Sequence, residues 1–299
     1  MDLSLEISGL RLENPTLLAS GILGMSYELM KSCSEAGASA VVTKSTGLKA
    51  REGFPNPTVV EARCGLINAL GLPNPGVGEM AKEIQKLKRD GIKVIASVYG
   101  FSPLEYVEAA KALERAGADA LELNISCPHV KEVGIEIGQN LNMAYEVTSS
   151  VKSKVSIPVI VKLTPNVTDI VSIAKALERA GADALTAINT VRAMAIDVEL
   201  EVPILSAKIG GLSGPAIKPI AIRCVYEVSK SVSIPVIGCG GIVDWQDAVE
   251  MLLAGASAVQ IGTGILYRGL RIFKEINVGV VEYLKRKNLK SIKDLKPVE

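Results

Sequence analysis

Short apolar runs recur along the chain at intervals that leave room for a helix between them. Four of these runs precede a helical pattern, at residues 16–20, 94–98, 159–163 and 236–240. Four others follow such a pattern, at residues 40–44, 120–124, 184–189 and 258–262. Because buried parallel strands are short and continuously apolar, each run predicts one such strand.

The chain also carries an internal repeat. The ten residues ALERAGADAL occupy 112–121 and return unchanged at 176–185. A helical pattern that ends on Ala-Gly-Ala, where a left-handed glycine cap is common, occurs four times, at Gly37, Gly117, Gly181 and Gly255. Four copies of strand, helix and strand predict an α/β fold of the (β/α)8 TIM-barrel type. An open doubly wound sheet is the rival, but it does not predict a fourfold repeat.

Alternation and capping patterns add detail to this barrel. Residues 3–7 and 10–12 alternate around Ser8-Gly9, which predicts an N-terminal β-hairpin that plugs the barrel's bottom. Ser102 precedes a proline and stands three residues before a Glu, which predicts a helix start, and we expect Asn74 and Asp244 to cap further helices. No linker rich in Pro, Ser or Gly interrupts the chain, so we expect a single domain over residues 1–299.

Composition and charge exclude some classes of binding partner for this chain. Of the 299 residues, 33 are Lys or Arg and 32 are Asp or Glu, which leaves a net charge of +1 and no basic footprint for nucleic acid. No apolar stretch approaches the ~20 residues that span a bilayer, and the acidic start lacks the features of a signal peptide. We therefore expect a cytoplasmic protein that has neither nucleic acid nor a membrane as a partner.

The five cysteines are widely spaced and form no C-x-x-C pair, so we expect no metal site, iron–sulfur cluster or disulfide framework in this chain. A lone cysteine is commonly a small buried hydrophobe, and we expect this of Cys33, Cys64 and Cys224. Cys127 differs because it lies three residues past a strand end, in a connection long enough for a lid. A cysteine at such a position is better explained as a group that carries a proton or acts as a nucleophile. His129 is close enough to assist it, although we favour a substrate contact or an exposed position for this histidine.

The last residue of each predicted strand is the place to look for chemistry, since TIM barrels carry it at the C-terminal ends of their strands. These residues are Ser20, Lys44, Ser97, Asn124, Lys162, Asn189, Gly240 and Gly262. Two lysines and two asparagines in a barrel mouth are costly to desolvate unless a ligand rich in acceptors pairs with them. Alternatively, each lysine caps backbone carbonyls or pairs with a Glu on a neighbouring strand. The longest connections, 45–73, 125–139 and 190–216, lie on the same face, which marks them as binding loops or lids.

Glycine-rich turns occur at residues 210–217, 238–242 and 262–264. Glycine lets backbone N–H groups approach a phosphate, and a helix N-terminus adds a favourable dipole. One such segment can be no more than a tight turn, but three side by side predict a phosphate site where TIM barrels often hold one. We expect a Cβ at Gly240 or Gly241 to occupy the position of that phosphate.

Seven segments together point to one family: VVTKST, NALGLPNPG, NISCPHV, VIVKLTPNVTDI, AINTVRAMAID, GGLSGPAIKP and VIGCGGI. They closely resemble dihydroorotate dehydrogenases of class 1, in particular the 1B branch, from about Leu3 to Thr263. The resemblance implies a flavin-dependent oxidoreductase that oxidises dihydroorotate to orotate in de novo pyrimidine biosynthesis and passes a hydride from C6 to FMN. It also implies that Cys127 removes the C5 proton, and that Lys162 lies against the flavin ring and stabilises its negative charge.

The same resemblance assigns binding residues by matching motif. Those implied around the FMN, one per chain, are Ser20, Lys44, Ser45, Ser97, Asn124, Lys162, Ile188, Gly214, Gly240, Gly241, Gly262 and Thr263. Those implied around the substrate are Lys44, Asn68, Ala69, Leu70, Gly71, Leu72, Asn124, Asn189 and Thr190.

The 1B resemblance further implies a partner subunit that carries FAD and a [2Fe–2S] cluster and passes electrons to NAD. This chain has neither a cluster motif nor a nicotinamide fingerprint of its own. A homodimer, or a heterotetramer with that subunit, is the expected assembly, and the electron acceptor stays open. The chain departs from the family's pattern at His129 and Ser97, where an Asn is usual, and at residues 264–269.

Three other functions stay open. The pyrimidine-reducing domain of a dihydropyrimidine dehydrogenase uses a cysteine in a similar loop, but NALGLPNPG and VRAMAID weigh against it. A tRNA dihydrouridine synthase uses FMN and a cysteine, but no basic patch is present. The third alternative is a barrel that binds a phosphate without redox chemistry, which a colourless purified protein would favour.

Overall fold

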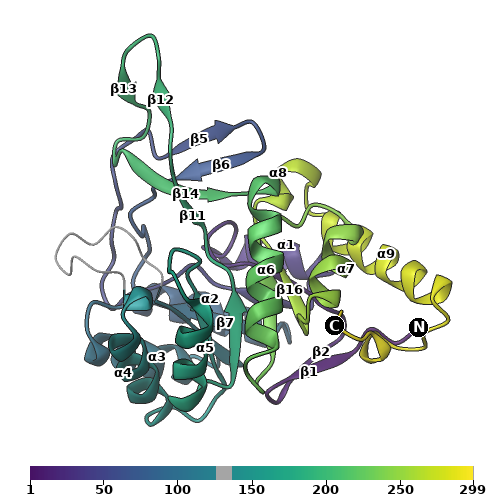
Figure 1. Cartoon of the computed structure of the whole chain (residues 1–299). Coiled ribbons are helices and arrows are strands. Elements are labelled where there is room, and N and C mark those ends of the chain that lie inside the picture. The colour runs from purple at the N-terminus through teal and green to yellow at the C-terminus, as the bar shows by residue number, and fades with distance from the viewer. Residues whose placement is uncertain (126–136, 299) are drawn as a thin grey trace.

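The computed structural model describes residues 1–125 and 137–298, and its centre is a closed barrel of parallel strands (Figure 1). The strands are β3 Thr16–Leu18, β4 Ala40–Val42, β7 Val94–Val98, β8 Ala120–Asn124, β9 Val159–Leu163, β10 Ala184–Ala187, β15 Val236–Cys239 and β16 Ala258–Ile261. Each pairs with the next one along the chain, and β16 closes the ring on β3. Every predicted apolar run contains one of these strands, so the TIM-barrel prediction is confirmed.

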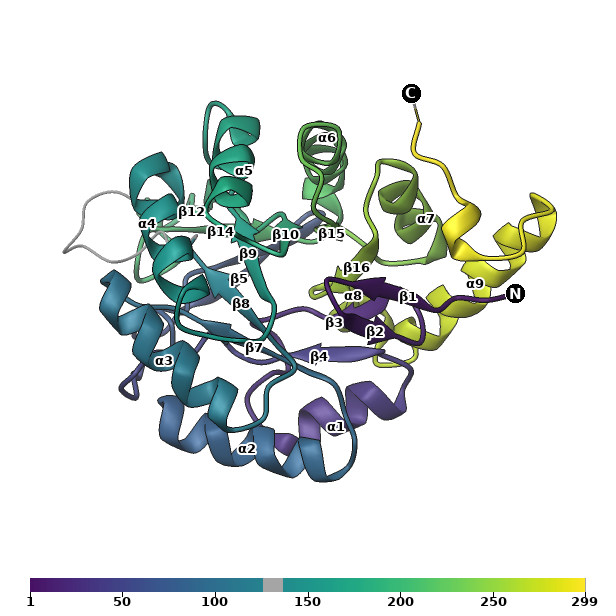
Figure 2. The same cartoon turned by 90° about the horizontal axis from the view of Figure 1, so that it is seen from below.

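Helices surround the strands, as the view from below shows (Figure 2). They are α1 Tyr27–Glu35, α2 Val77–Arg89, α3 Pro103–Arg115, α4 Leu141–Lys152, α5 Ile170–Arg179, α6 Lys218–Ser229, α7 Trp245–Leu253, α8 Gly264–Arg268 and α9 Ile272–Arg286, with short 3-10 turns at Ile137–Gln139, Pro215–Ile217 and Ile292–Asp294. On α5 the buried residues Ile170, Ile173, Ala174 and Leu177 form one apolar stripe, which packs the helix onto the barrel.

Helix ends follow the predicted signals with one exception. The four repeat glycines have φ values of +112°, +98°, +92° and +109°, which an L side chain rarely adopts. Ser102 caps α3 by accepting from the backbone N–H of Glu105, and Asp244 caps α7 in a capping box. The expected cap at Asn74 is wrong, because α2 begins at Val77 and the Asn74 side chain instead accepts from the backbone N–H groups of Gly47 and Gly76.

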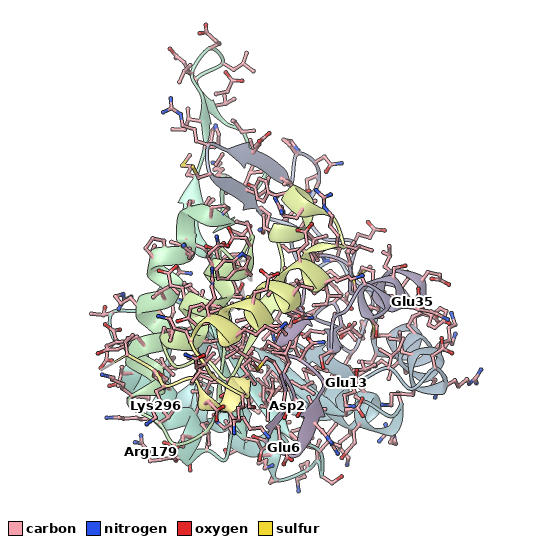
Figure 3. The ribbon with its side chains drawn as sticks, turned by 90° about the vertical axis from the view of Figure 1, so that its right-hand side faces the viewer. Asp2, Glu6, Glu13, Glu35, Arg179 and Lys296 are labelled. Carbon is pink, nitrogen blue, oxygen red and sulfur yellow. The ribbon has the colours of Figure 1, made fainter. Side chains whose placement is uncertain are left out.

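A hairpin of β1 Leu5–Ile7 and β2 Leu10–Leu12 lies at the N-terminal end of the barrel, as predicted. Its leucine and isoleucine side chains are buried, and the paired Glu6 and Arg11 face outward. Ser8 Oγ donates to the carbonyl of Asp183, one residue before β10, at 2.5 Å. Figure 3 shows Asp2 and Glu6 at this end of the molecule, opposite the projecting ribbon described next.

The long connections contain strands that the sequence pattern did not predict. An antiparallel sheet of β11 Val191–Met194, β14 Ile209–Ser213, β6 Gly65–Asn68 and β5 Val59–Ala62 lies over the barrel's C-terminal end (Figure 1). Beyond it, a ribbon of β12 Ile196–Asp197 and β13 Val202–Pro203 projects from the molecule. Within the described ranges, no helix has the length and apolar content needed to cross a membrane.

Candidate active site

A cavity of about 370 Å³ lies between the barrel mouth and the sheet of β5, β6, β11 and β14. This volume is in the range of small-molecule and cofactor sites. It is lined by nearly all the described residues that the resemblance assigns: Ser20, Lys44, Ser45, Asn68, Ala69, Leu70, Gly71, Leu72, Asn124, Lys162, Ile188, Asn189, Thr190, Gly214, Gly240, Gly241, Gly262 and Thr263. Ser97 is the exception among the assigned residues, because its side chain is fully buried and does not line the cavity, and its Oγ lies 2.9 Å from Ser45 Oγ.

Hydroxyl and amide groups from separate strands form a connected array at the cavity floor. Asn124 Nδ2 donates to Ser45 Oγ at 2.9 Å, and Asn189 Nδ2 donates to Asn124 Oδ1 at 3.3 Å. The hydroxyl groups of Ser20 and Ser45 are 3.3 Å apart. Because these bonds link residues at the ends of different strands, the polar atoms are positioned before any ligand arrives.

The wall segment that follows β6 is held by side chains that sequence reasoning did not single out for this role. Buried Asn74 donates from Nδ2 to the carbonyl of Leu72 at 2.9 Å and to the Tyr99 hydroxyl at 2.8 Å. Arg51 Nε donates to the carbonyl of Gly71 at 2.7 Å. Leu72 itself has a φ of +59°, which its neighbours must stabilise. The spacing of Arg51 and Asn74 in the sequence gives no signal for these contacts.

The wall that follows β10 has a similar support. Asn166 Nδ2 donates to the carbonyl of Thr190 at 3.1 Å, and its Oδ1 accepts from the backbone N–H of Arg192 at 2.9 Å. The backbone N–H of Thr190 donates to Asn189 Oδ1 at 2.8 Å. The start of this long connection is therefore fixed against the barrel.

Glycine turns form the end of the cavity next to α6. Gly214, Gly240 and Gly241 have φ values of +95°, +129° and +79°. A Cβ at Gly240 would lie 2.9 Å from Ala221 Cβ, and a Cβ at Gly241 would lie 2.5 Å from Lys218 Cβ. The expectation that these Cβ atoms would occupy a phosphate position is therefore wrong, since they point toward α6. Glycine is needed here so that the start of α6 packs against the turn that follows β15.

Lys162 lies at the cavity floor within a buried polar cluster. Its Nζ donates to Gln260 Oε1 at 3.0 Å and lies 3.8 Å from Oε1 of Glu122 on the neighbouring strand β8. Burial alone would lower the pKa of Lys162, but the Cys239 sulfur and the Glu122 carboxylate hold that pKa above its ordinary value. The alternative of pairing with a Glu on a neighbouring strand thus applies to Lys162, although its side chain also lines the cavity.

The cysteines divide differently from the prediction. Cys33 and Cys224 are buried, as expected, and burial raises the pKa of the Cys33 thiol to about 11. Cys64 is exposed in the turn between β5 and β6, because this turn lies in the sheet over the barrel and not in its core. Cys127 and His129 lie outside the described residues. Among the residues that the structure describes, no group of three or more His, Cys, Asp or Glu could hold a metal ion.

Comparison with known proteins identifies close relatives. A family model described as dihydroorotate dehydrogenase matches residues 2–284. The catalytic subunit of dihydroorotate dehydrogenase B (NAD(+)) from Pyrococcus horikoshii is 53% identical over 293 residues, which cover 98% of this chain and 96% of the relative. Its counterpart from Methanocaldococcus jannaschii is 50% identical over 291 residues, 96% of this chain and 95% of the relative. A crystal structure of DHODH from Eimeria tenella in complex with ferulenol has a TM-score of 0.85 at 23% identity, covers 99% of this chain and 88% of its own, and supports the fold alone.

Proposed function

The chain belongs to the dihydroorotate dehydrogenase family, and from that premise we propose that it oxidises dihydroorotate to orotate in pyrimidine biosynthesis, with FMN bound at the barrel mouth. The observation that carries this proposal is the composition of the cavity. It brings glycine turns to one end, and amide, hydroxyl and ammonium groups from separate strands to its floor.

The residues at the cavity fit FMN. The turns at Gly214, Gly240 and Gly241 keep side chains away from their backbone N–H groups, which suits the phosphate. Lys162 and the hydroxyl and amide array suit the polar edge of the ring system. Bound there, FMN supplies the acceptor for the substrate's hydride.

The substrate would lie against the wall formed by residues 68–72. Dihydroorotate carries a carboxylate and a cyclic imide. The Asn124 and Asn189 amides offer both donors and acceptors to the imide, and the Lys44 ammonium offers a positive charge to the carboxylate. The contacts of Asn74 and Arg51 hold the wall in place, so the substrate meets a fixed surface.

Removal of the C5 proton requires a base of the protein next to the substrate. We assign this role to Cys127 because of its place in the NISCPH segment, a few residues past the end of β8. A thiol is a suitable base because its ordinary pKa, about 8.5, lies near the working pH.

Electrons must then leave the chain for an acceptor. The relatives are named as the catalytic subunit of an NAD(+) enzyme, which supports a partner subunit for this chain as well. We propose that this subunit carries FAD and a [2Fe–2S] cluster and reduces NAD. A homodimer or heterotetramer, a cytoplasmic location and a single domain over residues 1–299 stay predictions.

Anaerobic mixing with dihydroorotate tests the activity. We expect the purified protein to be yellow and its visible flavin absorbance to fall when dihydroorotate is added without oxygen. Trial of NAD, fumarate and quinone as oxidants then identifies the acceptor that restores the absorbance. A colourless protein, or a flavin that dihydroorotate does not bleach, would contradict the proposal.

Alanine at Gly241 should weaken FMN binding about tenfold or more. The φ of +79° strains an L residue, and the new Cβ, 2.5 Å from Lys218 Cβ, must displace the start of α6. Titration of the apoprotein with FMN measures the change. Gly91→Ala is the matched control, because Gly91 has a φ of +73° but nothing within 4 Å of its added Cβ. If the two variants bound FMN equally well, the packing of the Gly241 turn against α6 would not matter for FMN binding, and the prediction would be wrong.

A further inference from the structure

One layer of the barrel interior is polar, whereas TIM barrels usually fill such layers with branched aliphatic side chains. Glu122 on β8, Thr186 on β10 and Gln260 on β16 are 0%, 0% and 1% exposed, and they come from alternate strands of the ring. Thr186 Oγ1 donates to Glu122 Oε2 at 3.0 Å, and Gln260 Nε2 donates to the same oxygen at 2.5 Å. A carboxylate is thus held below the cavity floor without lining the cavity itself.

Lys162 belongs to the next layer, closer to the cavity. In the register of β8 and β9 it stands opposite Asn124, two residues beyond Glu122. Gln260 bridges the two charged groups, since its Oε1 accepts from Lys162 Nζ at 3.0 Å while its Nε2 donates to Glu122. Within the described part of the chain, Glu122 Oε1 has no hydrogen-bond partner, and the Lys162 ammonium 3.8 Å away compensates its charge.

Among the residues that the structure describes, the groups that face Lys162 from the surrounding strands are as follows. The Cys239 thiol on β15 is buried, and burial raises its pKa, so it is neutral near pH 7. Lys44, after β4, lines the same cavity and adds a positive charge. Ser97 on β7, Thr186 on β10 and Gln260 on β16 are uncharged. The Cys239 sulfur also helps to hold the pKa of Lys162 up, and Glu122 supplies the carboxylate charge that offsets the desolvation of the ammonium.

We propose that Glu122 is a positioning residue, which keeps the Lys162 ammonium fixed and protonated at the cavity floor and so sets the reduction potential of the bound flavin. The inference rests on the proposed function, because it places a flavin over Lys162. Without the carboxylate, burial favours the neutral amine, and the floor loses the positive charge that stabilises negative charge in the ligand.

Direct titration of Lys162 tests the first half of the proposal. In protein labelled with ¹³C-lysine, the Lys162 signal is identified by its loss in Lys162→Met. In the parent protein this signal should keep the chemical shift of an ammonium group as the pH is raised past about 10.4, the ordinary pKa of lysine. In Glu122→Gln the proton affinity of Lys162 should fall about tenfold or more, so its signal changes at lower pH. This measurement works in the apoprotein. An unchanged titration would overturn the proposal.

The midpoint potential of the bound flavin, followed against pH by photoreduction with reference dyes, tests the second half. In Glu122→Gln the potential should fall below the parent's as pH rises and Lys162 loses its proton. We expect about a tenfold change in the reduction equilibrium, which is about 30 mV for a two-electron couple. A curve that coincides with the parent's at every pH would overturn the proposal.

Asp183→Asn is the matched control, because Asp183 also pairs with a lysine, Lys152 at 2.6 Å, but at the opposite end of the barrel. It should follow the parent in both measurements, and a shift equal to that of Glu122→Gln would overturn the proposal. If Glu122→Gln does not fold, Glu122→Asp keeps the charge but draws the carboxylate away from Lys162, and it should shift both readouts in the same direction by a smaller amount. Photoreduction needs no substrate, so a protein that shows these shifts but is not bleached by dihydroorotate would contradict the proposed function alone.

Discussion

Alanine at Cys127 should slow flavin reduction by dihydroorotate about 100- to 10,000-fold, the usual contribution of a general base. The protein should keep its FMN, because no cofactor contact is assigned to this side chain. An ordinary thiol, with a pKa near 8.5, is only a few per cent thiolate at neutral pH. The parent's rate should therefore rise with pH until the thiol is ionised, and Cys127→Ser should retain weak activity that is shifted to higher pH.

Rapid mixing under anaerobic conditions measures this step, because the loss of flavin absorbance precedes any transfer to a partner. Cys64→Ala is the matched control, since Cys64 is exposed, does not line the cavity and should leave the rate unchanged. If Cys127→Ala bleaches as fast as the parent, the base lies elsewhere, and His129 is the next residue to test.

Methionine at Lys162 should lower the midpoint potential of the bound flavin, slow its reduction by dihydroorotate at least about tenfold and destabilise the fold. The first two effects follow from the loss of a buried positive charge at the cavity floor. The third follows because Glu122 is left buried without its partner, which typically costs about 3–5 kcal/mol. Redox titration and chemical denaturation of the apoprotein measure these effects separately.

The double variant Lys162→Met with Glu122→Gln separates the effect on the flavin potential from the effect on the stability of the fold. Removing both charges should restore most of the free energy of unfolding, since an amide tolerates this site without a counter-charge. The potential should stay low, because the ammonium is still missing. A potential equal to the parent's in either variant would exclude Lys162 from the assigned role.

The local sequence pattern predicted the barrel because each strand and each helix end is marked by a pattern that spans only a few residues. Buried parallel strands are continuous apolar runs, and glycine after a helix marks a left-handed cap, as at Gly117 and Gly181. All the predicted strand-end residues except Ser97 line the cavity, since the C-terminal ends of parallel strands meet at one face.

The features that were missed depend on contacts distant in sequence. Leu212 pairs with Ile67 in the sheet over the mouth, although 145 residues separate them by number. Asn74 resembles a helix cap, and only the folded chain brings it to Tyr99. The Cβ direction at Gly241 is set by α6, and Cys64 is exposed because its turn lies above the core. None of these contacts leaves a local pattern.

The closure of the ring by β16 on β3, with Val259 opposite Thr16, also bears on the order of folding. Every other barrel strand pairs with its successor among the barrel strands, so those contacts close much shorter loops than the contact of β16 with β3 does. During synthesis β3 is the first barrel strand to emerge, and one of its edges stays unpaired until residues 258–261 have left the ribosome. Until then β3 and β15 are open apolar edges, the kind of surface through which incomplete chains associate. We therefore expect the pairing of β16 with β3 to protect the chain from association, because it covers the last two open edges of the sheet at once.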